Sequence, residues 1–178
     1  DGSSSLSVAH GSSLGDDFST AAGVYILATP TDGLDTNENS GIWFLDLPSG
    51  PGPGLEPPVL PDGWLYEGWV VITGTSVSTG RFSTVAAADL DAPYSVELGA
   101  PPLPDEDFLV NAPDGLTFPT DIAGTTSAIS VGPSPDDSST PFTLKPLVRS
   151  ILAGAAYHLD YSQDNNAQGF PTGTATIG

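Results

Sequence analysis

The sequence predicts an all-β fold, an antiparallel immunoglobulin-like β-sandwich with long loops rich in proline and glycine. Short apolar runs recur along the chain, 21 glycines and 18 prolines fall between these runs, and helical periodicity is nearly absent. Turn residues between short apolar runs are typical of strands in a sandwich. The length of 178 residues suits a single domain, because domains usually have roughly 100 to 200 residues. We therefore expect residues 1–178 to form one domain.

Nine segments are predicted to be strands. The run Val70–Ile72 is continuously apolar, which is typical of a central strand, whereas TSVSTGRF alternates and indicates a half-exposed one. Trp43 and Trp69 lie in strongly apolar segments, and we expect both to be buried. The predicted strands are residues 5–10, 23–30, 41–47, 65–73, 75–83, 126–133, 142–151, 155–162 and 174–178.

Two proline-rich segments, 48–63 and 98–108, are predicted to be extended surface loops. A proline has no N–H to give to a sheet, and a glycine loses much entropy when it becomes ordered. A helical turn is expected only within residues 152–160.

Charge and composition restrict the function classes. The chain has three basic residues, Arg81, Lys145 and Arg149, against 22 acidic ones, a net charge of -19. This charge repels phosphates, so nucleic acid and anionic membranes are poor partners. The absence of cysteine excludes disulfides and thiolate metal sites. The chain begins at Asp1 rather than Met and has no apolar run of about 18 residues, so we expect a removed export signal, a secreted protein and no membrane insertion.

Two stretches resemble the extracytoplasmic β-sandwich domain of anti-sigma-K factors. Residues 66–83, YEGWVVITGTSVSTGRFS, are similar to a strand, glycine turn and strand of that family, with Ser76 where proline is usual. Residues 126–148, TSAISVGPSPDDSSTPFTLKPLV, are similar to its next hairpin, with Gly132 in place of a glutamate. The resemblance implies an outer sensory domain without the sigma-binding segment or the membrane helix, so it does not imply anti-sigma activity.

The segment DTNENSGIWFLD has the spacing of a calcium-binding loop. Asp35, Asn37 and Asn39 alternate, and Asp46 stands at position twelve. Oxygen ligands at this spacing wrap a calcium ion, although here the glycine is one position late and a strand rather than a helix follows. Calcium is therefore the one cofactor that the sequence predicts, with a polar turn as the alternative.

Other polar residues give weaker candidates. A second oxygen-rich loop alternates Asp160, Ser162, Asp164 and Asn166. Three acidic clusters, 16–17, 105–107 and 136–137, are expected to be solvated, because hydrolysis requires two carboxyl groups that face each other in a cleft. No strand-to-helix turn is predicted to carry a nucleophilic serine, and no phosphate-binding glycine loop precedes a helix. We therefore predict no catalytic residues and no enzyme.

Trp64 and Tyr66 are the predicted ligand contacts. Trp64 stands beside the proline-rich loop and is the aromatic residue expected to be exposed, and a flat aromatic face can stack on a sugar ring. Glycans are therefore among the expected partners.

Both ends of the chain are predicted to be strands, and residues 1–12 are expected to form an N-terminal arm. Leu6, Val8 and His10 lie on one side of it. A terminal strand can complete the open sheet of a neighbouring subunit, so the first functional expectation is a non-catalytic structural protein that self-assembles into an extracellular filament or surface layer. The alternatives are a monomeric ligand-binding or sensory domain and a carbohydrate-active or hydrolytic domain that uses loop carboxylates.

Overall fold

The protein is all-β in the computed structural model, which describes residues 14, 17–48, 50–96, 101–136 and 138–170. Within these ranges there is no α-helix, only four 3-10 helices of three residues, so no helix there is long enough to span a membrane. The predicted strands at 5–10 and 174–178 lie outside the described residues. The 3-10 helices are η1 (Phe18–Thr20), η2 (Pro30–Asp32), η3 (Glu38–Ser40) and η4 (Ala167–Gly169).

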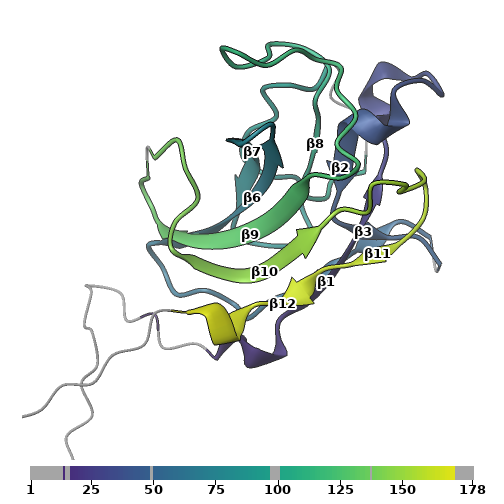
Figure 1. Ribbon diagram of the computed structural model, residues 1–178. Coiled ribbons are helices and arrows are strands. Elements are labelled where there is room, and N and C mark those ends of the chain that lie inside the picture. The colour runs from purple at the N-terminus through teal and green to yellow at the C-terminus, as the bar shows by residue number, and fades with distance from the viewer. Residues whose placement is uncertain (1–13, 15–16, 49, 97–100, 137, 171–178) are drawn as a thin grey trace, which may run out of the picture.

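Twelve strands pair in antiparallel sheets (Figure 1). One five-stranded sheet has the order β12-β10-β9-β6-β7, and the other has the order β11-β1-β2-β8 with β5 paired to β1. The remaining two strands, β3 and β4, form a small sheet of their own. This arrangement is consistent with a β-sandwich. The strands are β1 (Ala22–Leu27), β2 (Gly41–Trp43), β3 (Leu45–Asp46), β4 (Gly52–Pro53), β5 (Leu55–Glu56), β6 (Trp64–Ile72), β7 (Thr75–Phe82), β8 (Asp105–Asp107), β9 (Thr126–Pro133), β10 (Leu144–Ser150), β11 (Tyr161–Ser162) and β12 (Asp164–Asn165).

The β6–β7 hairpin matches the predicted pair of strands within one residue at each end. Thr73 and Gly74 form its two-residue turn, and both have positive φ, 49° and 88°. A turn with two such residues matches the twist of the adjoining strands, and glycine adopts this conformation without strain. β6 pairs with β7 on one side and β9 on the other, which confirms the central position predicted for Val70–Ile72.

The main core lies between the two sheets, and a smaller apolar cluster lies on the opposite face of β1 and β2. Tyr25 and Leu27 point into the main core, whereas Ile26 belongs to the smaller cluster. β1 is therefore buried on both faces. The predicted burial of Trp43 and Trp69 is confirmed, since their exposed fractions are 1% and 2%. The main core also receives Ile42, Phe44, Val70, Ile129 and Leu147.

Three segments differ from their predicted structure. The segment 48–63 contains the short strands β4 and β5, and 98–108 contains β8, which pairs with β2. The predicted strand 155–162 is reduced to β11, because turns occupy 153–154 and 157–159. No helical turn forms at 152–160; the backbone there makes a turn in which Ala155 N donates to Leu152 O.

Candidate functional site

A polar groove crosses the outer face of β6 and β7. It consists of two adjoining hollows, of about 300 and 480 Å³, that share Glu67, Ser78 and Ser138 as wall residues. Glu67 and Ser78 come from the hairpin β6–β7, and Ser138 comes from the connection between β9 and β10. Figure 1 shows this connection rising as a loop beyond the ends of the two strands. We call these two hollows the polar groove.

Glu67 is the half-buried acid of the polar groove. Its Oε1 accepts a hydrogen bond of 2.7 Å from Ser78 Oγ. Burial raises the pKa of the Glu67 carboxyl, and the nearby charges of Asp136 and Asp91 act in the same direction, whereas Ser78 and Arg81 oppose them. A carboxyl group in this setting gains a proton more readily than a solvated one, so it can donate as well as accept hydrogen bonds.

Arg81 faces Glu67 across the β6–β7 ladder and connects two walls of the groove. Its Nη2 lies 2.8 Å from Asp91 Oδ2, and its Nη1 donates to the backbone oxygen of Asp136 at 3.2 Å. The guanidinium thus joins β7 to the segment around Asp91 and to the β9–β10 connection. One side chain can make these contacts at once, because a guanidinium has several donors in fixed directions.

Two aromatic residues, the buried Trp69 and the half-buried Tyr94, line the larger hollow of the groove. Trp69 points to the outer face of the sheet with Glu67, and its Nε1 donates to Ser130 Oγ at 2.9 Å. The Trp69 ring is only 2% exposed, so the more exposed aromatic surface of this hollow comes from the half-buried Tyr94. Around the two rings stand hydroxyl groups of Ser76, Ser78, Ser138, Ser139 and Thr140. The groove therefore combines an aromatic surface, hydroxyl groups, a carboxyl group and a guanidinium.

Sequence reasoning missed this groove. The sequence places Glu67 only within a predicted strand, and Asp136 within a pair of acids expected to be solvated. Two signals in the sequence mark the site: Glu67 interrupts an apolar run, and Arg81 is one of three basic residues in the whole chain.

The three consecutive acids of β8 are buried, so the prediction that residues 105–107 are solvated is wrong. The Asp107 carboxylate accepts from Trp43 Nε1 at 2.7 Å and from both the backbone N and Oγ1 of Thr31, at 2.9 and 2.6 Å. Glu106 accepts from Ser95 Oγ at 2.6 Å. Burial raises the pKa of Asp107, and that of Glu106 to about 8.

Asp105 and Asp89 form the remaining part of this cluster. Asp105 N donates to Asp89 Oδ2 at 3.1 Å. Burial, strengthened by the neighbouring carboxyl groups, raises the pKa of Asp105 to about 9, and burial raises that of Asp89 to about 7. The polar groove is lined by none of the four acids of this cluster, Asp89, Asp105, Glu106 and Asp107. We therefore interpret the cluster as structural: it anchors loops to β8.

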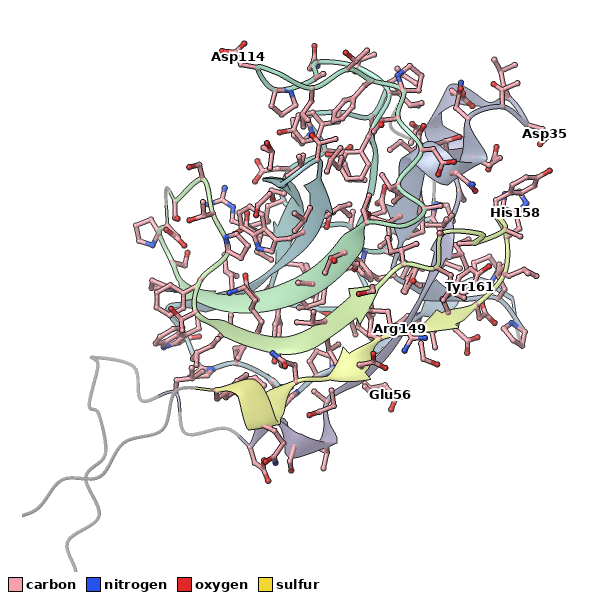
Figure 2. All side chains as sticks on the ribbon, in the orientation of Figure 1. Asp35, Glu56, Asp114, Arg149, His158 and Tyr161 are labelled. Atoms are coloured by element: carbon pink, nitrogen blue, oxygen red, sulfur yellow. The ribbon has the colours of Figure 1, made fainter. Side chains whose placement is uncertain are left out.

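The predicted calcium ligands are only partly brought together. Asn37 and Asn39 line a hollow of about 280 Å³ with Glu38 and Asp121, whereas Asp46 lies on β3. Asp35 is exposed at the outer end of its loop (Figure 2). Asn39 Oδ1 is buried without a hydrogen-bond partner, as expected of an oxygen that binds a cation. Within the described residues, however, no three Asp, Glu or His side chains converge as metal ligands, and calcium binding stays a prediction.

The second oxygen-rich loop is divided between the two sheets. Ser162 lies on β11, which pairs with β1, whereas Asp164 lies on β12, which pairs with β10. Asp164 binds Arg149 with both carboxylate oxygens, at 2.8 and 2.9 Å. Asp160 Oδ1 accepts from the backbone of Leu47 at 3.3 Å. The structure therefore gives these acids separate partners. Asn166 makes a further separate contact, from Nδ2 to Lys145 O.

The predicted exposure of Trp64 is wrong. Trp64 and Tyr66 both belong to the main core, with exposed fractions of 9% and 2%. The Trp64 ring packs edge-on against Phe142, and Tyr66 OH donates to the backbone oxygen of Pro58 at 2.6 Å. The proline-rich loop covers these aromatic rings instead of presenting them. The arm residues Leu6, Val8 and His10 lie outside the described residues.

No known protein family matches the chain, and no curated protein or solved structure is significantly similar to it. The residues that resemble anti-sigma-K factors form the hairpin β6–β7 and the strands β9 and β10. The resemblance to that family stays a prediction.

Proposed function

We propose that this chain is a secreted, non-catalytic, immunoglobulin-like binding module whose polar groove holds a saccharide. The observation that carries the proposal is the combination, in one groove, of the half-buried Glu67 carboxyl, the half-buried Tyr94 ring and a row of hydroxyl groups. Sites for small ligands place a few polar groups around an apolar surface in this way.

A saccharide suits the groove better than other polar ligands. Its hydroxyl groups both donate and accept hydrogen bonds, so they can pair with the hydroxyl groups of Ser78 and Ser138 and donate to the Glu67 carboxylate. Its C–H faces are apolar and can rest on the half-buried Tyr94 ring. Phosphate esters are disfavoured, because the chain carries a net charge of -19 and Arg81 is already paired with Asp91.

The test is binding of neutral glycans by the purified chain, first on a glycan array and then by calorimetry with the best saccharide. We expect Glu67→Gln to weaken binding about tenfold or more, since one hydrogen bond to a charged group is worth about 1.5 kcal/mol or more. Glu56→Gln is the matched control, because Glu56 is exposed on β5 in the other sheet. Absence of binding to any neutral glycan refutes the proposal, as does equal loss in both variants.

Hydrolysis is the second candidate, and the raised pKa of Glu67 beside Asp136 favours it. A carboxyl group that keeps its proton can act as a general acid, and a second carboxylate can act as base or nucleophile. The same saccharides separate the two functions. Release of reducing ends that stops in Glu67→Gln indicates a hydrolase, whereas intact glycans after long incubation with the wild-type chain indicate a binding module.

A further inference from the structure

One wall of the polar groove belongs to the segment 89–95, which is not a strand. This segment supplies Asp91 and Pro93 to the smaller hollow and Tyr94 to the larger one. It therefore contributes to both halves of the proposed ligand site. We call residues 89–95 the groove wall.

Carboxyl groups of the buried acid cluster fasten the groove wall to β8. Glu106 accepts from the backbone N of Tyr94 at 3.3 Å and from Ser95 Oγ at 2.6 Å. At the other end of the groove wall, Asp89 Oδ2 accepts from Asp105 N at 3.1 Å. β8 itself is paired with β2 in the other sheet. The position of the groove wall thus depends on two carboxyl groups, one at each end.

The groove wall also packs on β7, which β8 contacts although the two strands belong to different sheets (Figure 1). Leu90 N donates to Arg81 O at 2.8 Å. The Asp89 carboxyl lies so close to Gly80 that an added Cβ on Gly80 would overlap it. Gly80 and Arg81 both line the smaller hollow. A displacement of Asp89 therefore changes the surroundings of the groove.

The charged groups that face these acids are other acids. Asp105 is faced by Asp89, Glu106 and Asp107, Glu106 by Asp89 and Asp107, and Asp89 by Asp91 of its own segment. Burial raises the pKa of Asp89 to about 7, that of Glu106 to about 8 and that of Asp105 to about 9, and the neighbouring charges add to the effect. Each proton that leaves therefore adds a negative charge to a buried site that already repels it.

We infer that Asp89, Asp105 and Glu106 hold the groove wall against β8 while they are protonated and release it when they ionise, so that binding in the polar groove depends on pH. The inference rests on the ligand site proposed above and adds its regulation. The fastened position binds more protons than a released one, in which the acids are solvated and ionise near their ordinary pKa values. The released position therefore gains population as the pH rises through the raised values.

The first test follows the groove wall without any ligand. The chain has no cysteine, so Leu90→Cys and Ser150→Cys allow two spin labels to be attached, one on the groove wall and one on β10. Both positions are exposed. We expect electron paramagnetic resonance to give one distance between the labels at pH 6, and a second distance that becomes populated by pH 9, with an unchanged circular dichroism spectrum.

Variants of the acids locate the switch. A chain with Asp89→Asn, Asp105→Asn and Glu106→Gln keeps its acceptor oxygens but cannot ionise there, so we expect a single distance from pH 6 to pH 9. Asp114→Asn is the matched control, because it removes a charge from an exposed loop, and it is expected to behave as the wild type. Glu106→Ala removes the acceptor and is expected to release the groove wall at both pH values. Recovery in Glu106→Gln then separates positioning from a general loss of stability.

The second test measures the affinity for the best-binding neutral glycan of the array at pH 6 and pH 9. We expect the wild-type affinity to fall about tenfold or more over this interval, and that of the triple variant to fall about twofold at most. A tenfold loss corresponds to release of the groove wall in about nine tenths of the molecules. Glu67 is the same in both chains, so the difference between them reports the groove wall.

Two results overturn the inference. One is a single label distance at both pH values in the ligand-free wild-type chain, and the other is an equal loss of affinity in the wild type and the triple variant. Absence of glycan binding refutes the saccharide site instead, and the label distances still decide whether the groove wall is released.

Discussion

Replacing Asp105 with asparagine is expected to stabilise the protein at neutral pH and to have little effect at pH 4. The Asp105 carboxyl is buried on β8 beside Asp89, Glu106 and Asp107, and its pKa rises from an ordinary 3.8 to about 9. In the unfolded chain the group ionises near its ordinary value, whereas in the folded chain it keeps its proton. The folded state therefore binds more protons, and stability falls as pH rises between the two values.

The size of the effect follows from the interval between the two pKa values. Each pH unit above 3.8 costs about 1.4 kcal/mol of folding free energy until the folded pKa is reached. At pH 7 the accumulated cost is about 4 kcal/mol, and at pH 4 it is below about 1 kcal/mol. Asparagine has nearly the same shape and no charge, so it removes this cost. We expect a gain of about 2 to 4 kcal/mol at pH 7, or roughly 10 °C in the melting temperature.

The assay is urea denaturation of the wild-type chain and Asp105→Asn at pH 4, 5.5, 7 and 8.5, followed by tryptophan fluorescence. Asp114→Asn is the control, because it removes the same charge from an exposed position. The control is needed since a chain of net charge -19 gains some stability from the loss of any acid. The reasoning is refuted if Asp105→Asn gains no more than Asp114→Asn, or if its gain is the same at pH 4 and pH 7.

Three further predictions concern other parts of the chain. Gly80→Ala is expected to lower the free energy of unfolding, measured by urea denaturation, by about 3 kcal/mol or more. Gly80 has φ +106°, and an added Cβ would lie 2.4 Å from the Asp89 carboxyl. Gly115→Ala is the control: Gly115 has φ +86° but open space around it, so the expected loss is about 1 kcal/mol. Calcium is expected to raise the melting temperature of chelator-treated protein, and the Asp121→Asn variant is expected to show a smaller rise. The calcium site at Asn37 and Asn39 would be contradicted if calcium gives no heat in calorimetry and no shift in the melting temperature. Self-assembly through residues 1–12, the first expectation from the sequence, predicts filaments of the intact chain in electron micrographs that disappear when these residues are deleted, and a monodisperse monomer of the intact chain would exclude it.

The sequence predicts the large sheet well, because its strands carry strong local signals. Residues 65–73, 75–83 and 126–133 are apolar or alternating and are bounded by glycine or proline, and β6, β7 and β9 end within one residue of them. β8 carries no such signal. Its sequence, Asp-Glu-Asp, has the composition of a solvated loop. Burial of its carboxyl groups depends on hydrogen-bond donors from residues that are distant in the sequence, such as Trp43 Nε1.

The candidate site could not be predicted for a related reason. Glu67 and Ser138 are 71 positions apart in the sequence, and they share a groove only because β9 pairs with β6 and brings the β9–β10 connection over the hairpin. Spacing motifs detect ligands within one loop, so they found the alternation of Asp160 and Asp164. That alternation is divided between two sheets in the folded chain.

The shortage of basic residues connects the buried acids with the groove. A chain with 22 acids and three bases cannot neutralise buried carboxyl groups with salt bridges, so Asp107 and Glu106 depend on hydrogen-bond donors and Asp105 on its own proton. Two of the three bases, Arg81 and Arg149, are committed to exposed ion pairs, which ordinarily contribute little to stability. Arg81 stabilises little through this ion pair, yet it joins two walls of the groove around the half-buried Glu67, and this placement is in line with the ligand binding proposed above.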